Sequence, residues 1–366
     1  VRCYYREKSE TKFNGKGKNS RNTKKGLTAH LSESKYNMSK LAEEEFTFDA
    51  EDTSKAYVES YGVDSYFYFT KEVNSGIYPK GRTDDITVLF DVSASAKNRD
   101  IEKEIEFLKA YIKDNLQSGK GKRKTAVTVS IYPFADRLLE KDALKIRVNG
   151  EEELKKIEEY IKALDFDGAS GFPKIDLGKF TSKTEILLFS DGLFNYGEEK
   201  DQINKVINVI TSGTSNDYNY LKKLARDSLG SYINLSKYSV KDAVKSLENE
   251  QLKIIRYEYK KGDIKDVYPL AGSVVEGGSL TVTGILEEKE APLKICLVYG
   301  NKVVHELYVT LSVFDAPQSE MNIPRIWGVK AIDELSSDYD KNREEIISLS
   351  KEFKIVTKET SFLVLE

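Results

Sequence analysis

The chain of 366 residues is long enough for two or three domains at roughly 100–200 residues each. Hydrophobic residues make up 39% of it, and 57 basic residues nearly balance 60 acidic ones. The net charge of −3 gives no reason to expect nucleic acid or a membrane surface as a partner. No apolar run reaches the length of about 18 residues that a transmembrane helix needs, so we expect no membrane insertion.

Two cysteines, Cys3 and Cys296, are too few for a disulfide framework. A single bridge between them would require the chain ends to meet, so two buried free thiols are the simpler expectation. The first residue is Val1, and no apolar, signal-like stretch follows it, which predicts a fragment that lacks its native N-terminus. The sequence therefore leaves the compartment unknown.

Residues 81–250 alternate between strand and helix patterns. Residues 86–90 form a nearly continuous apolar run, typical of a strand buried on both faces. Ile101, Ile105 and Leu108 then recur at helical spacing. Further strands are expected at residues 126–134, 143–148, 185–190, 205–210 and 231–235, and further helices near residues 154–164 and 221–229. This alternation predicts an α/β fold with a doubly wound, mostly parallel sheet and helices on both faces.

Five oxygen-bearing side chains lie on three of the expected loops. Asp91 directly follows the first strand, with Ser93 and Ser95 after it; Asp191 follows the fourth strand, and Ser170 lies on the loop before that strand. In such sheets ligands bind beyond the carboxyl ends of the strands, where the strand order reverses. Carboxylate and hydroxyl oxygens without His or Cys suit a hard cation such as Mg²⁺. Such an ion would keep waters and an open position that an acidic group of a partner could fill.

These five residues resemble the metal-ion-dependent adhesion site of the von Willebrand factor A family. That site combines an Asp-x-Ser-x-Ser loop, here Asp91, Ser93 and Ser95, with a threonine on a second loop and an aspartate on a third. Ser170 matches the threonine and Asp191 the aspartate. The resemblance implies a Rossmann-like A domain that binds Mg²⁺, with Mn²⁺ or Ca²⁺ as alternatives. It also implies adhesion to a protein partner that supplies an acidic residue, outside the cytoplasm or in the cell envelope.

Two positions depart from the family pattern. Ala94 stands where glycine is usual, and Gly171 follows Ser170 where an acidic residue is common. Both departures concern metal affinity more than fold. Residues 132–136 and 221–231 add similarity to the family.

The flanks resemble proteins with a vault/inter-alpha-trypsin (VIT) domain. Residues 266–284 and 323–366 look like the segment that follows the A domain in those proteins. In relatives, segments on both sides of the A domain build a shared β-rich hub. The domains expected are residues 1–80 as an N-terminal β-rich segment or linker from the end of the VIT region, residues 81–250 as the A domain, and residues 251–366 as a hub with a β-sandwich and helices.

The residues of the flanks also indicate β structure by themselves. Short strands separated by turn signals are expected at residues 253–259, 279–285, 293–298 and 303–309, and residues 65–70 and 45–48 could join them in a sandwich. Helices are expected near residues 326–335 and 346–353. Trp327 is expected to be a packing anchor of this part of the chain.

Other functions have less support. His30 and His305 are the only histidines, and both lie outside residues 81–250, so a serine or cysteine nucleophile would have no histidine base near the proposed site. The basic segments 12–25 and 120–124 lack the frame of a phosphate-binding loop and are interpreted as solvated loops.

The sequence thus predicts a non-enzymatic, metal-dependent protein-binding module. The alternative is a metal-independent structural or assembly scaffold whose metal site is vestigial, because Asp and Ser are favoured at turns and helix caps without any function.

Overall fold

The structure is a computed structural model. It describes residues 55–73, 78–116, 126–172, 175–194, 203, 205–300, 302–314, 321–357 and 360, together with the backbone of three short strands, Arg2–Cys3, Ser20–Thr23 and Gly26–His30. The strand expected at residues 45–48 and the basic loop at 120–124 lie outside the described residues, as does most of the basic segment 12–25.

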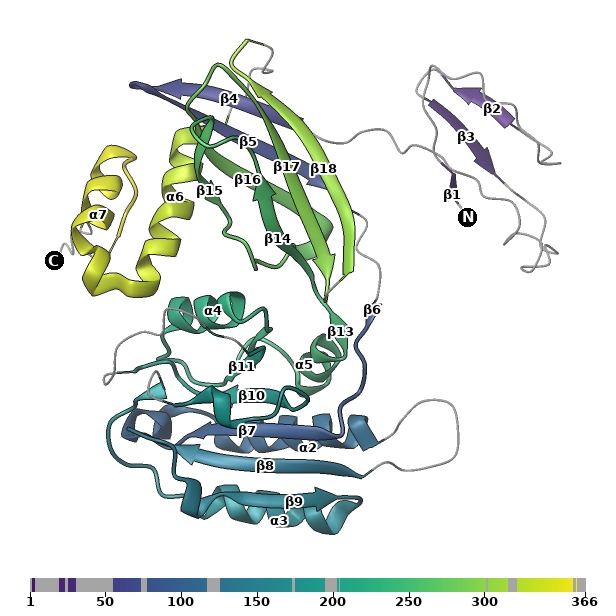
Figure 1. Ribbon diagram of the computed structural model, residues 1–366, viewed down its shortest axis with the longest axis vertical. Coiled ribbons are helices and arrows are strands. Elements are labelled where there is room, and N and C mark those ends of the chain that lie inside the picture. The colour runs from purple at the N-terminus through teal and green to yellow at the C-terminus, as the bar shows by residue number, and fades with distance from the viewer. Residues whose placement is uncertain are drawn as a thin grey trace, which may run out of the picture.

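A six-stranded sheet forms one end of the molecule (Figure 1). Its strands are β7 (Asp85–Asp91), β8 (Val127–Phe134), β9 (Leu144–Val148), β10 (Glu185–Phe189), β11 (Ile207–Thr211) and β12 (Tyr232–Asn234). They lie in the order β12-β11-β10-β7-β8-β9, and every pair is parallel except β8 with β9. Strand β7 is central and buried from Ile86 to Asp91, because both faces of this sheet are covered.

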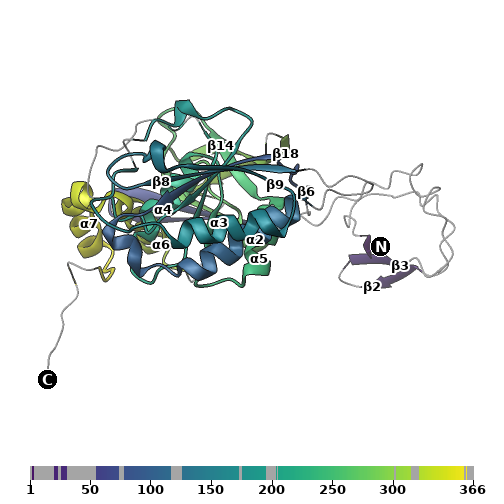
Figure 2. The ribbon, with the colours of Figure 1, turned by 90° about the horizontal axis from the view of Figure 1, so that it is seen from below.

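Each face of the six-stranded sheet packs against its own apolar cluster. One face carries α2 (Ile101–Leu116), α3 (Glu151–Lys162) and α5 (Val240–Leu247), whose apolar stripes join the first cluster (Figure 2). The other face carries α4 (Tyr218–Asp227), together with Phe172 and residues 175–180. Residues of β7 and β10 alternate between the two clusters, as the period of a strand requires.

Two antiparallel sheets pack face to face at the other end (Figure 1). The first contains β14 (Leu252–Glu258), β17 (Glu290–Tyr299) and β18 (Lys302–Ser312). The second contains β15 (Ile264–Tyr268), β16 (Ser279–Leu286), β5 (Asp64–Glu72) and β4 (Lys55–Tyr61). A buried apolar cluster that includes Phe67, Phe69 and Ile295 lies between them. Cys296 on β17 is a buried free thiol.

Helix α6 (Ile323–Leu335) covers the outer face of the second sheet, and α7 (Tyr339–Glu352) packs against α6. Asn322 caps α6 by accepting a hydrogen bond from the Arg325 N–H, and Pro324 lies in the first turn. Trp327 packs against Tyr66 and Phe353 and donates its indole N–H to the Asp266 carbonyl oxygen at 2.9 Å, which confirms it as a packing residue.

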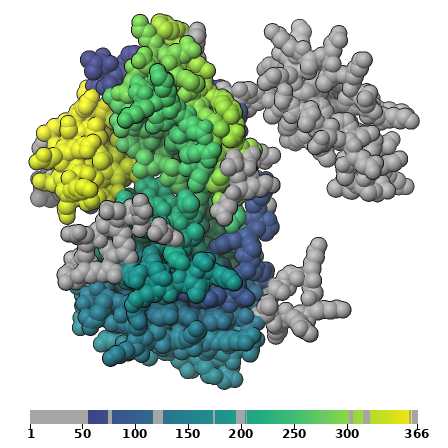
Figure 3. Space-filling model, viewed as in Figure 1, coloured from purple at the N-terminus to yellow at the C-terminus, as the bar shows by residue number. Residues whose placement is uncertain are grey.

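The two ends of the molecule lie against each other (Figure 3), and α4 contacts α6 at this boundary. Arg226 at the end of α4 pairs with Glu334 of α6. The Lys253 ammonium group of β14 donates hydrogen bonds to the carbonyl oxygens of Leu229 and Gly230, the latter at 2.7 Å. The short strands β6 (Tyr78–Pro79) and β13 (Asn249–Glu250) pair where the chain enters and leaves the six-stranded unit.

The predicted fold class, a doubly wound and mostly parallel fold, is wrong for this chain. Of the five sheets in the described residues, four are antiparallel throughout, and the six-stranded sheet alone is mostly parallel. The helices are few beside this β-rich content. Parallel neighbours need a crossover of about a dozen residues or more, and the chain has such crossovers between residues 85 and 234. Elsewhere, hairpins such as β4–β5 and β17–β18 join successive strands, so the pairing is antiparallel.

None of the helices in the described part of the chain is both long and apolar enough to cross a membrane.

Candidate functional site

Two buried aspartates lie where the two central strands end. Asp91 is the last residue of β7, and Asp191 lies two residues beyond the end of β10. The two strands are parallel neighbours with Phe90 opposite Phe189, so their carboxyl ends meet at the same edge. Relative exposure is 0% for Asp91 and 1% for Asp191. A pair of carboxylates so removed from water is costly without a compensating charge or donors.

Hydrogen bonds from three serines hold the Asp91 carboxylate. Its Oδ1 accepts from the Ser93 N–H at 2.9 Å, which closes a tight turn after the strand. Its Oδ2 accepts from the hydroxyls of Ser190 at 2.6 Å and Ser170 at 3.4 Å. The Ser93 and Ser95 hydroxyl oxygens lie 3.2 Å apart. The structure therefore brings the predicted residues Asp91, Ser93, Ser95 and Ser170 together.

The loop that carries Ser170 is attached to this turn by backbone hydrogen bonds. The Ala94 N–H donates to the Gly168 carbonyl at 3.0 Å, and the Asp167 N–H donates to the Val92 carbonyl at 2.9 Å. Gly168 has φ +84°, which favours glycine. A Cβ atom at Gly171 would lie 2.7 Å from the Asp136 carbonyl oxygen, so this departure from the family pattern follows from the close approach of two loops.

Asp191 keeps one carboxylate oxygen without a hydrogen bond. Its Oδ1 accepts from the Leu193 N–H at 2.9 Å, whereas its Oδ2 is buried and has no partner among the described residues. Burial raises the pKa of Asp191, and the negative charge of Asp91 adds to the rise; the Leu193 N–H, the Ser95 hydroxyl and the charge of Arg99 act in the opposite direction. Asp191 is thus the predicted site residue whose buried negative charge lacks a hydrogen-bond partner at one oxygen.

The backbone beside Asp191 is fixed against α4. Its carbonyl oxygen accepts from the Asp217 N–H at 2.8 Å, and Asp217 caps α4. Gly192 has φ +76°, and a Cβ atom there would lie 2.7 Å from Leu221 Cγ. Glycine at this position therefore allows the chain beyond β10 to pass close to α4.

The donor set fits a hard cation. Two carboxylates and three hydroxyls supply oxygen ligands alone, and the orphaned Asp191 Oδ2 is a buried anionic oxygen that a cation would satisfy. Within the described ranges, no group of three or more His, Cys, Asp or Glu side chains is placed to hold a metal. An ion here would therefore need hydroxyl and water ligands beside the two carboxylates, as Mg²⁺ accepts.

Sequence reasoning missed a buried ion pair under the two aspartates. Arg99 donates from Nη2 to the Asp91 carbonyl oxygen and from Nη1 to the Phe189 carbonyl oxygen, both at 2.9 Å. Its Nε lies 3.3 Å from Glu104 Oε1, and both side chains are fully buried. Ser212 donates to the same Glu104 oxygen at 2.6 Å.

A signal for this pair is present in the sequence. Glu104 lies between Ile101 and Leu108 on the apolar stripe of α2, where a charged residue has no place on a simple amphipathic helix. Burial raises the pKa of Glu104, and the positive charge of Arg99 and the Ser212 hydroxyl oppose that rise. Ser190, the residue before Asp191, also belongs to the site through its hydrogen bond to Asp91, which is not among the predicted contacts.

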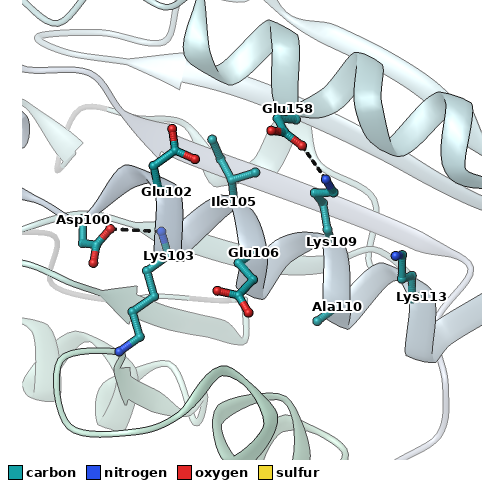
Figure 4. A pocket seen from close by; sticks show the side chains of 9 residues that line it. All are labelled: Asp100, Glu102, Lys103, Ile105, Glu106, Lys109, Ala110, Lys113 and Glu158. Atoms are coloured by element: carbon teal, nitrogen blue, oxygen red, sulfur yellow. Dashed lines mark hydrogen bonds and ion pairs between the residues drawn. The ribbon is translucent and has the colours of Figure 1, made fainter.

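A separate groove of about 680 Å³ runs along α2 (Figure 4). It is lined mainly by charged side chains of α2, with Glu158 of α3 on one side. Lys109 points toward Glu158 and pairs with it, and Lys103 donates to the Leu235 carbonyl oxygen. The groove contains none of the five predicted site residues, and its mixture of acids and paired lysines selects no one charge of ligand.

Comparisons with known proteins leave the family open. No protein-family model matches the chain, and a search of curated proteins found no match. Among solved structures, the chain is similar to the pilus adhesin SpaC from Lactobacillus rhamnosus GG in its open conformation, with 11% identity, a TM-score of 0.28 and coverage of 70% of this chain and 47% of the adhesin. The human COPII-coat protein Sec24c matches with 11% identity, a TM-score of 0.37 and coverage of 75% and 50%.

Proximal thread matrix protein 1 from the mussel byssus matches with 17% identity, a TM-score of 0.28 and coverage of 47% of each chain. The chain thus spans about half the length of each of these proteins, at 47%, 50% and 47%. Likenesses at these identities and TM-scores carry no argument about the function of this chain.

Proposed function

We propose that this chain is a non-enzymatic protein-binding module whose binding depends on a divalent cation at the carboxyl edge of the six-stranded sheet. The observation that supports it most is the buried, unpartnered Oδ2 of Asp191. A lone buried carboxylate oxygen costs free energy, and a cation shared with the carboxylate of Asp91 would offset that cost.

The residues of the site have separate roles in this proposal. Ser93, Ser95 and Ser170 would offer hydroxyl oxygens to Mg²⁺, while Asp91 and Asp191 would act directly or through water. The ion would supply a positive charge with an open coordination position, and a carboxylate from a protein partner would fill it. The resemblance of these five residues to an adhesion site supports this choice of partner. Adhesion would place the protein at a cell surface or in the envelope.

Calorimetric titration of the purified chain with Mg²⁺ and with Mn²⁺ tests the proposal. We expect saturable binding at one site, which Asp191→Asn and Ser170→Ala weaken by about tenfold or more. Asp340→Asn, which changes an exposed aspartate on α7, is the matched control and should bind as the wild type does. Absence of binding at millimolar ion, or equal binding by Asp191→Asn, would refute the proposal.

A scaffold without metal is the second candidate, and one observation favours it. Both oxygens of Asp91 already accept hydrogen bonds from Ser93, Ser190 and Ser170, so that carboxylate does not require an ion. In that case the chain would fold and assemble through other surfaces. Unchanged thermal stability and oligomeric state in chelator, measured by calorimetry and light scattering, would support the scaffold; a loss of either on metal removal would count against it.

A further inference from the structure

We infer, on the basis of the proposed function, that Arg99 and Glu104 form a positioning pair that fixes the two strand ends of the site and sets its charge for one divalent cation. Neither residue would touch the ion. Arg99 would act through the backbone of Asp91 and Phe189, and Glu104 would act through Arg99 and through its own charge.

The geometry links the pair to both halves of the site. The two ends of the Arg99 guanidinium group donate to the carbonyl oxygens of Asp91 on β7 and Phe189 on β10, so one rigid side chain spans the two strand ends. Phe189 lies two residues before Asp191. The planar guanidinium group also lies 5.0 Å from the centre of the Phe90 ring, which restricts its tilt.

Glu104 is itself held in place. Ser212 donates to its Oε1 and accepts a hydrogen bond from the Asp100 N–H at 2.8 Å, so the acid is connected to the start of α2 and to the end of β11. Its Oε2 has no hydrogen-bond partner among the described residues. The pair is thus an ordered network and not a chance contact of two long side chains.

The buried charged side chains of the site and of the positioning pair add up to a net negative charge. Asp91, Asp191 and Glu104 carry three negative charges when ionised, and Arg99 carries one positive charge. Glu104 interacts electrostatically with Asp91, and Arg99 with Asp191, so the four groups form one cluster. The net charge of two negative units equals the charge of one Mg²⁺ ion with the sign reversed. A pair that served packing alone would need neither the two carbonyl contacts nor this balance.

The test compares ions of different charge on variants of the full chain. Arg99→Met removes the positive charge of the cluster and both carbonyl contacts, so Mg²⁺ affinity should fall by about tenfold or more. Its ratio of Tb³⁺ to Mg²⁺ affinity, from terbium luminescence and calorimetry, should nevertheless rise on the order of tenfold, because the extra negative charge favours the trivalent ion. Glu104→Gln leaves one negative charge and should lower that ratio.

Two further variants keep the test independent of folding defects. The double variant Arg99→Met with Glu104→Gln restores two negative charges, so its ratio should return to the wild-type value while Mg²⁺ affinity stays low. Arg99→Lys keeps the positive charge but cannot donate to both carbonyl oxygens as the guanidinium group does, so the ratio of Tb³⁺ to Mg²⁺ affinity should be unchanged. Equal changes in Mg²⁺ and Tb³⁺ affinity across the variants would overturn the inference and leave the proposed function standing. If the wild-type chain binds neither ion, the proposed function itself fails.

Discussion

Asp191→Asn should stabilise the metal-free protein while it removes metal binding. Asparagine has nearly the same shape, and its carbonyl oxygen can still accept the hydrogen bond from the Leu193 N–H. The substitution removes a buried negative charge whose Oδ2 has no partner and which lies beside the charge of Asp91. The asparagine amide would still be a buried polar group, so the gain comes from removing the desolvated charge and its repulsion by Asp91; we expect the free energy of unfolding in chelator to rise by about 1–3 kcal/mol.

The size of the effect is within reach of thermal and chemical denaturation. At about 2–4 °C per kcal/mol for a unit of the size of the six-stranded part, the gain corresponds to a rise in melting temperature of a few degrees. Measurements in chelator at pH 7 should therefore place Asp191→Asn above the wild type. In Mg²⁺ at about one thousand times its dissociation constant, the wild type should gain about 4.1 kcal/mol and overtake the variant.

The sign of the pH dependence gives a second check on Asp191. Its pKa in the folded state is raised, so across the window just above the ordinary carboxyl range the folded chain binds more protons than the unfolded chain. The free energy of unfolding in chelator should therefore fall as the pH rises through that window, and Asp191→Asn should fall less. A variant that is less stable than the wild type in chelator, or as responsive to Mg²⁺, would refute the reasoning.

Three further variants test other parts of the structure. Gly171→Asp installs the acidic residue of the family pattern, but its Cβ would meet the Asp136 carbonyl oxygen, so urea denaturation should show a loss of about 1–3 kcal/mol; an unchanged midpoint would argue against the close approach of the loops. Ser190→Ala removes the 2.6 Å hydrogen bond to Asp91 and should cost about 1.5–3 kcal/mol in the same assay, whereas a neutral result would mean that water replaces the hydroxyl. Burial lowers the pKa of Lys253 from 10.5 to about 8, so between these pH values the unfolded chain binds more protons than the folded chain. The free energy of unfolding of the wild type should therefore increase as the pH rises through this range. Lys253→Met should lack this increase, and identical pH profiles for the two proteins would contradict the assignment.

Some parts of the fold follow from short-range patterns. The apolar runs at residues 86–90 and 185–190 appear as β7 and β10, because strands buried on both faces leave a continuous apolar signal. Which strands pair with each other does not follow from such patterns. Strand β5 pairs with β16 from Ser65 opposite Leu286 to Glu72 opposite Ser279. The two strands are more than 200 residues apart in the chain, and the residues of neither strand identify the other as its partner. The predominance of antiparallel pairing was missed for that reason.

The candidate site also has contacts that the sequence predicts and contacts that it does not. Asp91, Ser93 and Ser95 are adjacent in sequence, and the parallel pairing of β7 with β10 brings Asp191 to the same edge, so a motif and one topological rule predict their proximity. Whether they bind metal stays a prediction. The place of Glu104 on the apolar stripe of α2 indicates a buried acid, but no local pattern identifies Arg99 as its partner. Only the three-dimensional structure shows the two side chains to be paired.

Helix α4 joins the site to the rest of the molecule. Asp217 at its start donates its N–H to the Asp191 carbonyl, and Arg226 in its last turn pairs with Glu334 of α6. Its ten residues span about 15 Å, and a helix of that length resists compression far better than a loop does. A compressive load on the sandwich end would therefore reach the Asp191 backbone along a rigid helix, which connects the position of the Asp191 carboxylate to that of α6.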